Sequence, residues 1–600
     1  MTVRINPSDY YIYKFFSVYY PKFPIELMVK ILQYTTIQDI LLFQSLTKDD
    51  ETKKLEIKHI TNEKLTYEIN CKHRFKPFHF INGIANVVAL MGDREPSISV
   101  RLDFKEGKYF KRSCLEYIEG LPSCFNFELN FDELRYSKYD DLISFIDFTY
   151  ITSLKILKMT SGERSMKLNF SRLYVKSFHL VTNLSHIKLT LPSFEDLTDL
   201  SIDNAFEGEY YANLVNLKTF GIYISKGRRF NIEHVPRGVT ELKIVVKYVS
   251  KSENENCEYV KIKSRQDWPI NLKSLTLDDS KNEAGAFKDV FGVLPSNLIK
   301  FSVCGHSFYK FSSQFPDSII DLHLYSTFSV MDIPYVDLQF PSSLENIVFQ
   351  NLKMIVPNKS YNLPTRLKSF KLDFSDLSLS LNNFNFDHCK SSLKNLQISR
   401  YEEPLVFSNL NFSEFLKLTN IELVSCGIKS LSHFKPPRCL KTLQVCRNPI
   451  TTIDETCDLF NNENGCPLLQ SISIKGCQIS FISPNIEWPI NLKSLVIQDE
   501  VPKDFYFNTS IAKHESLETL YLSVLSSFKF CEVDKAIKRK TKIKSFVLSV
   551  TDDFLPTKPY ELLKFYDKIH LFLGKRVLNR KADTSVFENL TLLLGDSNSR

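Results

Sequence analysis

The sequence is short of glycine, with 17 in 600 residues, which is under half of the roughly 7% found in average proteins. Loops that wrap phosphate groups depend on glycine, because the backbone must approach the phosphate closely. The sequence also contains no Walker-type nucleotide loop, no His-Glu-x-x-His and no Gly-x-Ser-x-Gly motif. We therefore expect a protein that is not an enzyme and that binds no cofactor.

Long apolar runs and paired cysteines are also missing. No stretch approaches the roughly 18 consecutive apolar residues of a membrane span, so no membrane association is expected. The 13 cysteines include no Cys-x-x-Cys pair, and residues 1–20 lack the apolar core of a secretory signal. Such a chain is expected in the cytoplasm, the nucleus or both, with reduced thiols and no bound metal.

The charges are nearly balanced. The 76 lysines and arginines exceed the 69 acidic residues by only seven, which is too small an excess to indicate nucleic acid binding. With 43% hydrophobic and 24% charged residues, the composition is that of a folded globular protein. A nucleic acid partner is therefore not expected.

One phrase, Pro-x-x-Leu-x-x-Leu-x-Leu, recurs along the chain. It stands as PINLKSLTL at Pro269, PTRLKSFKL at Pro364 and PINLKSLVI at Pro489. The residue at the first leucine position of the phrase, three residues after the proline, is called the start of a unit here, and its mean spacing of roughly 25 residues lies in the range of leucine-rich repeats. The starts are Leu272, Leu298, Ile319, Leu344, Leu367, Leu393, Leu418, Leu440, Leu469, Leu492, Leu517 and Ile543.

Within each unit the apolar residues alternate as they do in a β-strand. The second and third, such as Leu275 and Leu277, lie two positions apart, so both point to one face of a strand. A single short strand cannot bury this face, but stacked units share a continuous core. The pattern predicts an α/β fold, namely a leucine-rich repeat solenoid with a curved parallel sheet.

Three successive units resemble the full leucine-rich repeat consensus. At the consensus asparagine position they carry Cys426, Asn448 and Cys477, each three residues after the third apolar residue. The resemblance implies a buried ladder in which these side chains bond backbone groups of the turn that leaves the strand. A structural role is favoured over metal or redox chemistry.

The repeat becomes less regular towards the N-terminus. We expect the solenoid to span residues 151–600, most clearly 269–550, after a helical segment at 20–62. The stretch 63–150, with its strand-like runs ISVRLDF and FNFELNF, is either degenerate first repeats or an N-terminal cap. Two last strands are expected near Ile569 and Leu590. The less regular units are interpreted as Leu154-x-x-Leu157-x-Met159, Leu214-x-x-Leu217-x-x-Phe220 and Val239-x-x-Leu242-x-Ile244.

The segment 20–62 begins with a small α-helical hairpin, indicated by helical spacing of apolar residues on both sides of a Thr-Thr break. Its spacing from Phe23 to Leu46 resembles the F-box, which binds a Skp-type adaptor in cullin-RING ubiquitin ligases. In that family leucine-rich repeats after the F-box hold the substrate, and the proline-led repeats resemble FNIP-type repeats of yeast-like F-box proteins. The resemblance assigns adaptor binding to Phe23, Pro24, Leu27, Ile31, Leu32 and Ile40.

The resemblance implies a substrate-recognition subunit of an SCF-type ubiquitin ligase, with a Skp-type adaptor, a cullin and a protein substrate as partners. The sequence departs from the family at Thr35, where leucine is usual, and in TKDDETKK after Leu46, where Cys and Trp are usual. The alternative is a non-ligase scaffold for protein–protein interaction, in which the hairpin caps the first turn of the solenoid.

The strand residues between the apolar ones are expected to project from the concave side of the solenoid. They lie two, four and six residues after each start, which makes 36 positions, of which seven are charged and none is arginine. A phosphorylated ligand is disfavoured, because its recognition usually takes arginine clusters. The candidate substrate-binding residues on this side are Asp321, His323, Tyr325, Asn346, Gln350, Asn395, Gln397, Thr519 and Tyr521.

The basic excess lies elsewhere. Residues 535–544 (KAIKRKTKIK) form a dense basic run, which we interpret as a solvated helix, with a nuclear localisation signal or a contact for acidic surfaces as alternatives. Lysine also follows the start directly in six units. These lysines are Lys273, Lys368, Lys394, Lys441, Lys493 and Lys544.

Overall fold

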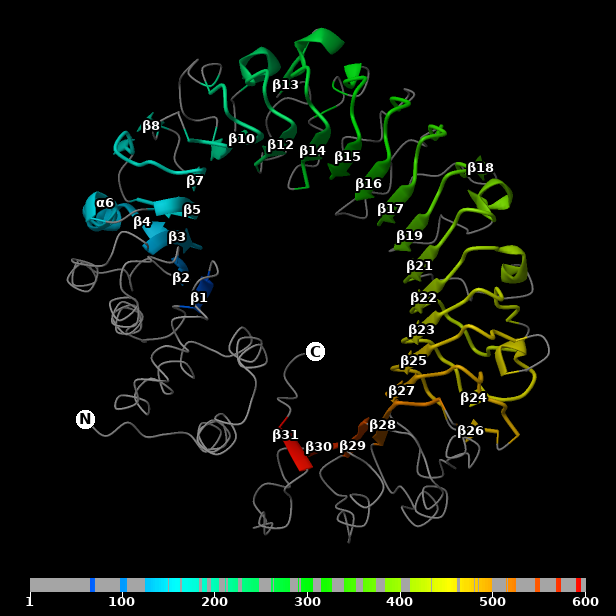
Figure 1. The fold of residues 1–600 in the computed structure, drawn as a ribbon. Coiled ribbons are helices and arrows are strands. Elements are labelled where there is room, and N and C mark those ends of the chain that lie inside the picture. Colours follow the sequence, from blue (N-terminus) through cyan, green and yellow to red (C-terminus); the bar gives the residue numbers. More distant parts are fainter. Residues whose placement is uncertain are drawn as a thin grey trace, which may run out of the picture. The chain divides into compact units, whose positions relative to one another are not determined.

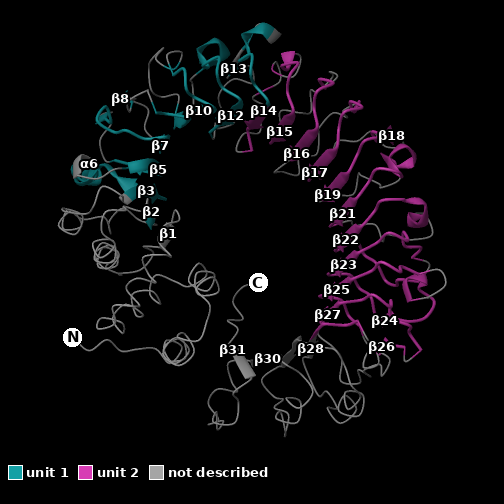
Figure 2. Cartoon of the chain, viewed as in Figure 1, with its two compact units in different colours: residues 1–273 teal, residues 274–600 magenta. Residues whose placement is uncertain are grey.

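The computed structural model describes residues 65–70, 98–104 and 125–148 and, with gaps in the connecting loops, residues 151–498, 514–524, 545–550, 568–573 and 590–594. These residues fall into two units, residues 1–273 and residues 274–600 (Figure 2). Each unit is built from parallel β-strands joined by loops (Figure 1). The segment expected to be helical at 20–62 and the basic run at 535–544 lie outside the described residues.

Unit 1 contains a parallel sheet whose main strands pair in the order of the chain, from β1 to β12. The strand-like runs expected within 63–150 are β2 and β3 of this sheet. The main strands are β1 (Leu65–Asn70), β2 (Ile98–Phe104), β3 (Phe125–Phe131), β5 (Ile151–Thr160), β7 (Ser177–Thr182), β9 (Asp199–Asp203), β10 (Thr219–Ile224) and β12 (Glu241–Val246).

Shorter elements of unit 1 lie in the connections between the main strands. The helix α6 (Tyr139–Phe148) carries Asp140 and Asp141 in its first turn, where carboxylates interact favourably with the helix dipole. The strands β6 and β8 pair with each other, as do β11 and β13. Further short elements are β4 (Leu134–Arg135), η4 (Tyr136–Lys138), β6 (Ser165–Asn169), β8 (His186–Thr190), β11 (Phe230–Asn231), η6 (Ile232–His234), β13 (Val260–Lys261) and η7 (Arg265–Asp267).

Two of the three less regular sequence repeats, which lie in unit 1, were assigned to the wrong register by the sequence pattern. Leu157, expected in the core, is 42% exposed, and the buried alternation of β5 begins earlier, at Ile151, Leu154 and Ile156. For β10 the start is Leu217 rather than Leu214, although both are buried. The error has a physical cause, because a strand with apolar residues on both faces fits more than one register.

A buried ion pair in unit 1 was not visible in the sequence. The Asp203 side chain is fully buried, and Lys247 Nζ donates both to Asp203 Oδ2 and to the carbonyl oxygen of Thr182. These three residues come from the ends of three different turns. A buried carboxylate needs such a partner, because an unpaired charge is strongly disfavoured in the interior.

Unit 2 contains a second parallel sheet with main strands from β14 to β31, again paired in chain order. The two last strands expected from the sequence are β30 and β31. The main strands are β14 (Ser274–Asp278), β15 (Lys300–Cys304), β16 (Asp321–Tyr325), β17 (Asn346–Gln350), β19 (Ser369–Asp373), β21 (Asn395–Ser399), β22 (Asn420–Val424), β23 (Thr442–Cys446), β25 (Ser471–Lys475), β27 (Ser494–Gln498), β28 (Thr519–Val524), β29 (Ser545–Val550), β30 (Lys568–Leu573) and β31 (Leu590–Leu594).

Each main strand from β14 to β29 begins two residues after its start, so the repeat phrase located the strands correctly. Within unit 2 the main strands follow the inner side of the ribbon, and the short elements follow the outer side (Figure 1). The short elements are β18 (Tyr361–Asn362), β20 (Phe384–Asn385), η11 (Asp387–Cys389), η13 (Phe412–Glu414), β24 (Thr452–Ile453), η14 (Asp458–Phe460) and β26 (Phe481–Ile482).

The core of unit 2 is made of the apolar residues of the phrase. In the repeat that begins at Leu440, the start and the next two apolar residues, Leu443 and Val445, are all fully buried. Register stacks them on equivalent residues, so Leu443 pairs with Ile421 on one side and Ile472 on the other. Burial of one such side chain contributes roughly 1.5–3 kcal/mol. The side chain is removed from water only when the turns on both sides of it are stacked against it.

The proline of the phrase belongs to a tight turn that leads into each strand. The N–H of Leu272 donates to the carbonyl oxygen of Pro269 at 3.0 Å, and Leu492 donates in the same way to Pro489 at 2.9 Å. Proline suits this place because only its carbonyl group is needed, while its missing N–H costs nothing there.

A second turn, at the other end of several strands, uses a left-handed residue seven positions after the start. Arg400, Ser425 and Arg447 have φ angles of 53°, 53° and 52°, a conformation that costs a residue with a Cβ roughly 1 kcal/mol. The turn extends the sheet, since the N–H of Arg447 donates to the carbonyl oxygen of Lys475 at 2.6 Å. At Gly305 (φ 127°) a Cβ atom would lie 1.9 Å from Asp279 Oδ1, so only glycine fits.

The predicted polar ladder is confirmed. Asn448 Oδ1 accepts from the N–H of Cys426 at 2.7 Å and of Ile428 at 3.3 Å, and its Nδ2 donates to the carbonyl oxygens of Leu423 and Cys446 at 3.0 and 2.8 Å. Cys426 Sγ donates to a carbonyl group of the preceding turn at 3.3 Å. The ladder satisfies backbone groups that the turn buries.

Substitution of Asn448 by alanine is expected to lower the free energy of unfolding by about 3 kcal/mol, because two buried N–H groups and two carbonyl groups lose a partner. Denaturant unfolding, with hydrogen exchange of the neighbouring amides, measures the change. The control is Asn395→Ala, whose exposed amide accepts one bond from Asn420 at 2.6 Å. Equal destabilisation by the two variants would contradict a special role for Asn448.

Candidate interaction surface

The strand face of unit 2 consists of the side chains two, four and six residues after each start. All nine candidate binding residues lie on this face, on β16, β17, β21 and β28. Their side chains alternate with the buried residues of the same strands, as the pattern of β16 illustrates: Asp321, His323 and Tyr325 are half-buried, whereas Leu322 and Leu324 are buried. A partner can therefore contact the strand face without displacing the buried side chains of the core.

Register brings five of the nine candidates together. Asp321 pairs with Asn346 and Tyr325 pairs with Gln350 across β16 and β17, and His323 lies between them on β16. Asn395 and Gln397 on β21 are separated from β17 by one strand, β19. Thr519 and Tyr521 on β28 lie a further five strands away, about 24 Å at the usual strand spacing. The seven candidates on β16, β17 and β21 therefore form one group, and the two on β28 form a second.

Hydrogen bonds already link several strand-face side chains across neighbouring strands. Asn346 Nδ2 donates to Asp321 Oδ1 at 2.5 Å, and Asn420 Nδ2 donates to Asn395 Oδ1 at 2.6 Å. Amides and hydroxyl groups carry both donors and acceptors, so a partner's backbone can still bond to the remaining ones. These cross-strand bonds hold the side chains in place before a partner arrives.

His323 stands at the centre of the charged part of the face. Burial and the positive charge of Lys300 lower its pKa below the usual range for histidine, against the opposing influence of Asp321, and Lys371 lowers it further. The imidazole is therefore neutral at pH 7. A neutral imidazole offers one donor and one acceptor, which suits hydrogen bonding to an uncharged segment.

Two arginines, Arg400 and Arg447, border the strand face in the exit turns of β21 and β23, although none of the 36 strand-face positions is arginine. Arg400 is in the exit turn after β21, and its Nε donates to Asp373 Oδ1 at 2.6 Å while Nη2 donates to Asn351 Oδ1 at 2.8 Å. The 36 positions counted in the sequence do not include Arg400, because it lies seven residues after its start, outside the strand. Its charge is matched by Asp373, so the face still presents no free arginine cluster to a phosphate.

Two cysteines of unit 2 have thiols that stay protonated. Burial raises the pKa of the Cys304 and Cys389 thiols to about 12, so both are protonated at neutral pH. A protonated thiol is a poor nucleophile and metal ligand. Among the residues that the structure describes, no group of three or more His, Cys, Asp or Glu side chains has the arrangement of a metal site.

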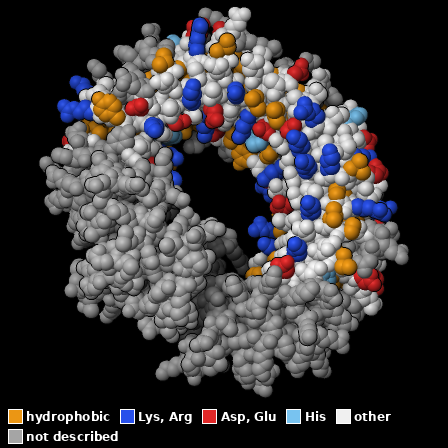
Figure 3. Space-filling model, viewed as in Figure 1, with side chains coloured by type: hydrophobic (Ala, Val, Ile, Leu, Met, Phe, Trp, Pro, Cys, Tyr) orange, Lys and Arg blue, Asp and Glu red, His pale blue; other side chains and the backbone are white. Residues whose placement is uncertain are grey.

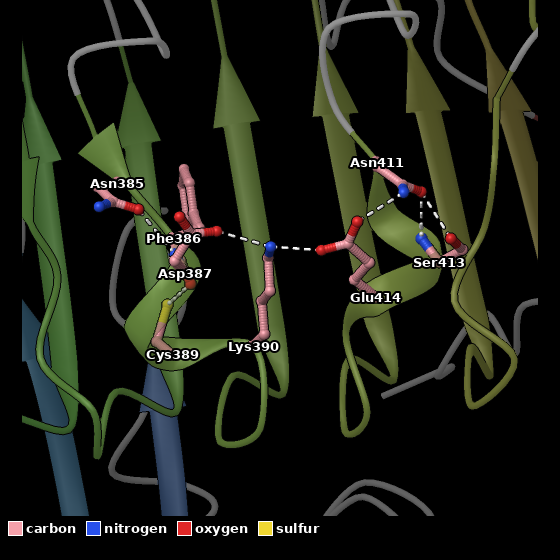
Figure 4. Close-up of polar contacts among 8 residues, drawn as sticks. All are labelled: Asn385, Phe386, Asp387, Cys389, Lys390, Asn411, Ser413 and Glu414. Carbon is pink, nitrogen blue, oxygen red and sulfur yellow. Dashed lines mark hydrogen bonds and ion pairs between the residues drawn. The ribbon is translucent and has the colours of Figure 1, made fainter.

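An ion-pair cluster joins two turns on the outer side of unit 2 (Figure 4). Lys390 Nζ lies 2.6 Å from Asp387 Oδ1 and also bonds Glu414 Oε2 of the next turn. Asn411 Nδ2 donates to Glu414 Oε1 at 2.8 Å. The bonds from Lys390 hold the pKa of both carboxyl groups below the usual range. A single lysine bridges two carboxylates from successive turns, so the cluster couples the two turns.

The strand face of unit 1 contains one buried polar atom without a partner. His179 Nε2 on β7 makes no hydrogen bond, and the ring packs edge-on against Tyr223 with centroids 5.6 Å apart. Burial, together with the positive charges of Lys155 and Lys243, lowers the pKa of His179 to about 4. The sequence pattern predicted no such environment, because it arises from neighbouring turns.

The six residues predicted to bind an adaptor, Phe23, Pro24, Leu27, Ile31, Leu32 and Ile40, lie outside the described residues. Their arrangement therefore stays a prediction. Among the described residues, no helix is both long and apolar enough to cross a membrane.

Comparison with known proteins adds one similarity. No protein-family model matches the sequence, and no curated protein matches it either. Among solved structures the chain is similar to a chain in the crystal structure of the mouse RP105/MD-1 complex, with 14% sequence identity, 75% of this chain and 87% of that chain covered, and a TM-score of 0.36. The assignment as a leucine-rich repeat solenoid rests on the phrase, the register and the buried rows described above.

Acidification is expected to destabilise unit 1 through His179. Because the folded pKa is near 4 and the unfolded value is near 6.5, the unfolded chain binds an additional proton between these pH values. Stability is therefore full above pH 6.5 and falls as the pH drops towards 4, by up to about 3 kcal/mol.

The measurement is denaturant unfolding with hydrogen exchange of the β7 and β10 amides between pH 7 and pH 4, in the wild type and in His179→Gln. The difference between the two proteins should change over this range, and the His179 ring should titrate near pH 4 by NMR. A difference that is independent of pH would contradict the assignment.

Proposed function

We propose that the chain is a non-catalytic, intracellular substrate receptor of a cullin-RING ubiquitin ligase, in which the strand face of unit 2 binds a protein substrate. The observation that carries the receptor role is the strand face, a long run of neutral polar side chains held in register over a separately buried core. Repeat solenoids use such extended surfaces to bind other proteins.

Three features of the face favour a folded protein or an uncharged segment as substrate. Its amides and hydroxyl groups are held by cross-strand bonds, so their ordering costs little on binding. Its tyrosines, Tyr325 and Tyr521, are residues of the type enriched at binding hot spots. Its central histidine is neutral, and Arg400 at its border is paired with Asp373.

The connection to a ligase is supported by the sequence from Phe23 to Leu46, which resembles an F-box. In this proposal Leu27 and Ile31 pack against a Skp-type adaptor, which links the chain to a cullin. The helical hairpin predicted from the sequence would be too small to form a core of its own, so in this proposal its apolar residues pack on a partner. The second candidate function is a scaffold without a ligase, in which those residues pack on the solenoid instead.

Substitution of Leu27 and Ile31 by aspartate separates these two functions. If the ligase proposal holds, a Skp-type adaptor co-purifies with the wild type and is lost from the double variant, because two charges cannot be buried in the interface. The thermal unfolding midpoint of the chain should stay unchanged. An adaptor absent from the wild type, together with a lower midpoint in the variant, would favour the scaffold.

Substitution of Tyr325 and Gln350 by alanine should remove the substrate while leaving the adaptor bound. The two residues are neighbours across β16 and β17, and loss of such central side chains typically weakens binding about tenfold or more. Quantitative mass spectrometry of cross-linked partners provides the measurement. Tyr174→Ala serves as control, since Tyr174 is 60% exposed and lies outside the main strands. Equal losses in both variants would contradict the assignment of the face.

A further inference from the structure

A second surface of unit 2 runs along the edge where the chain enters the strands. The residue directly after each start donates its N–H to the carbonyl oxygen of the equivalent residue in the preceding turn, as in Lys394 to Lys368 at 2.8 Å and Lys493 to Gln470 at 2.8 Å. These bonds stack the residues in one row, here called the entry ladder. It consists of Glu345, Lys368, Lys394, Thr419, Lys441, Gln470, Lys493 and Glu518.

The interior of the entry ladder carries positive charge only. Lys368 is matched, since its Nζ lies 2.7 Å from Glu345 Oε2. Lys394, Lys441 and Lys493 are exposed, and none lies in an ion pair with a residue that the structure describes. Lys394 acts on Glu345 only at longer range, where it adds to the larger effect of Lys368 in lowering the pKa of Glu345. The residues between them, Thr419 and Gln470, are neutral. The turns that lead into the same strands add Lys417 and Arg438, both exposed.

Apolar side chains are exposed beside these cations. Leu416 is 71% exposed, Ile490 is 69% exposed and Leu468 is 47% exposed, and each precedes a start by one or two residues. Single exposed apolar residues are common, but these three stand in the entry turns of β22, β25 and β27. On the face seen in Figure 3, lysine and arginine side chains recur over unit 2 with apolar side chains between them.

The spacing of the unmatched lysines is regular. Lys394, Lys441 and Lys493 precede β21, β23 and β27, and each pair of these strands is separated by one other strand, β22 or β25. At about 4.8 Å per strand this makes steps of about 10 Å. A peptide in the polyproline II conformation has three residues per turn and rises about 3.1 Å per residue, so every third side chain points the same way, at steps of about 9 Å, and meets one lysine.

We propose that the entry ladder between β21 and β27 binds an acidic segment of a partner protein in the polyproline II conformation, with a carboxylate at every third residue and apolar side chains between the carboxylates. The carboxylates pair with Lys394, Lys441 and Lys493, and the apolar side chains pack on Leu416 and Ile490. This surface is distinct from the strand face, so it adds a second contact to the proposed receptor and does not depend on the ligase.

A linear row of single lysines suits a linear row of carboxylates better than it suits a phosphate group. Phosphate recognition usually gathers several donors around one point, most often with arginine. Here the charges are spread along one line, and the apolar residues beside them would gain nothing from a phosphate. A flat anionic lipid surface shares the charge and the apolar character, so the experiment includes it as a competing outcome.

The test measures binding of fluorescent peptides to the full chain by anisotropy at low salt. The first peptide is five repeats of Asp-Leu-Ser, and the second has the same composition with its aspartates gathered at one end. We expect the spaced peptide to bind about fivefold more tightly, because only its carboxylates reach all three lysines at once. Equal affinities for the two peptides would overturn the proposal.

Variants then locate the site. Lys441→Glu with Lys493→Glu should weaken the spaced peptide about tenfold, whereas Lys429→Glu with Arg447→Glu, the same change of charge at exposed residues away from the entry ladder, should weaken it less than about twofold. Ile490→Ser should weaken the Asp-Leu-Ser peptide but not an Asp-Ser-Ser peptide. Equal effects of the two charge-reversal pairs would overturn the proposal.

Vesicles that contain anionic lipid test the competing surface. We expect the wild type and the Lys441→Glu, Lys493→Glu variant to associate with such vesicles equally weakly. Strong association of the wild type that the variant loses, without binding of the spaced peptide, would assign the row to a membrane and overturn the proposal. Thermal unfolding of each variant confirms that the solenoid is intact.

Discussion

The structure depends on the in-register stacking of short parallel strands, because no single turn can bury its own apolar residues. In the turn that begins at Leu440, the start, Leu443 and Val445 are fully buried only because equivalent residues of the two neighbouring turns cover them. A slip of one residue would turn this apolar set out of the core. Every other feature of unit 2, including its surfaces, follows from that register.

Register also explains how a chain with few glycines and little charge excess presents two different surfaces. The same stacking that aligns the buried rows aligns the polar residues on the strand face, where Asp321 meets Asn346. It aligns the residues of the entry ladder as well, where backbone bonds connect Lys394 to the turns on both sides. A substitution at one position therefore changes one element of a row, and the neighbouring turns keep the row in place.

The strands of unit 2 were predictable because the phrase states their period directly. Each main strand from β14 to β29 begins where the phrase places it, and the resemblance to the leucine-rich repeat consensus implied the ladder at Asn448. In unit 1 the same reasoning chose wrong registers for β5 and β10, where apolar residues such as Leu157 also occur on the outer face. Alternation identifies a strand, but it selects a face only where the opposite face is polar.

The sequence alone determined the class of the fold, the position of the strands and the neutral polar character of the strand face, because these follow from residue spacing within one turn. Only the tertiary structure decided which residues of different turns meet. Arg400 meets Asp373, Lys247 meets Asp203, and the buried Nε2 atom of His179 has no partner. Such contacts depend on how loops of unequal length place the residues at their ends. The spacing of residues along the chain does not give the distance between residues of different turns.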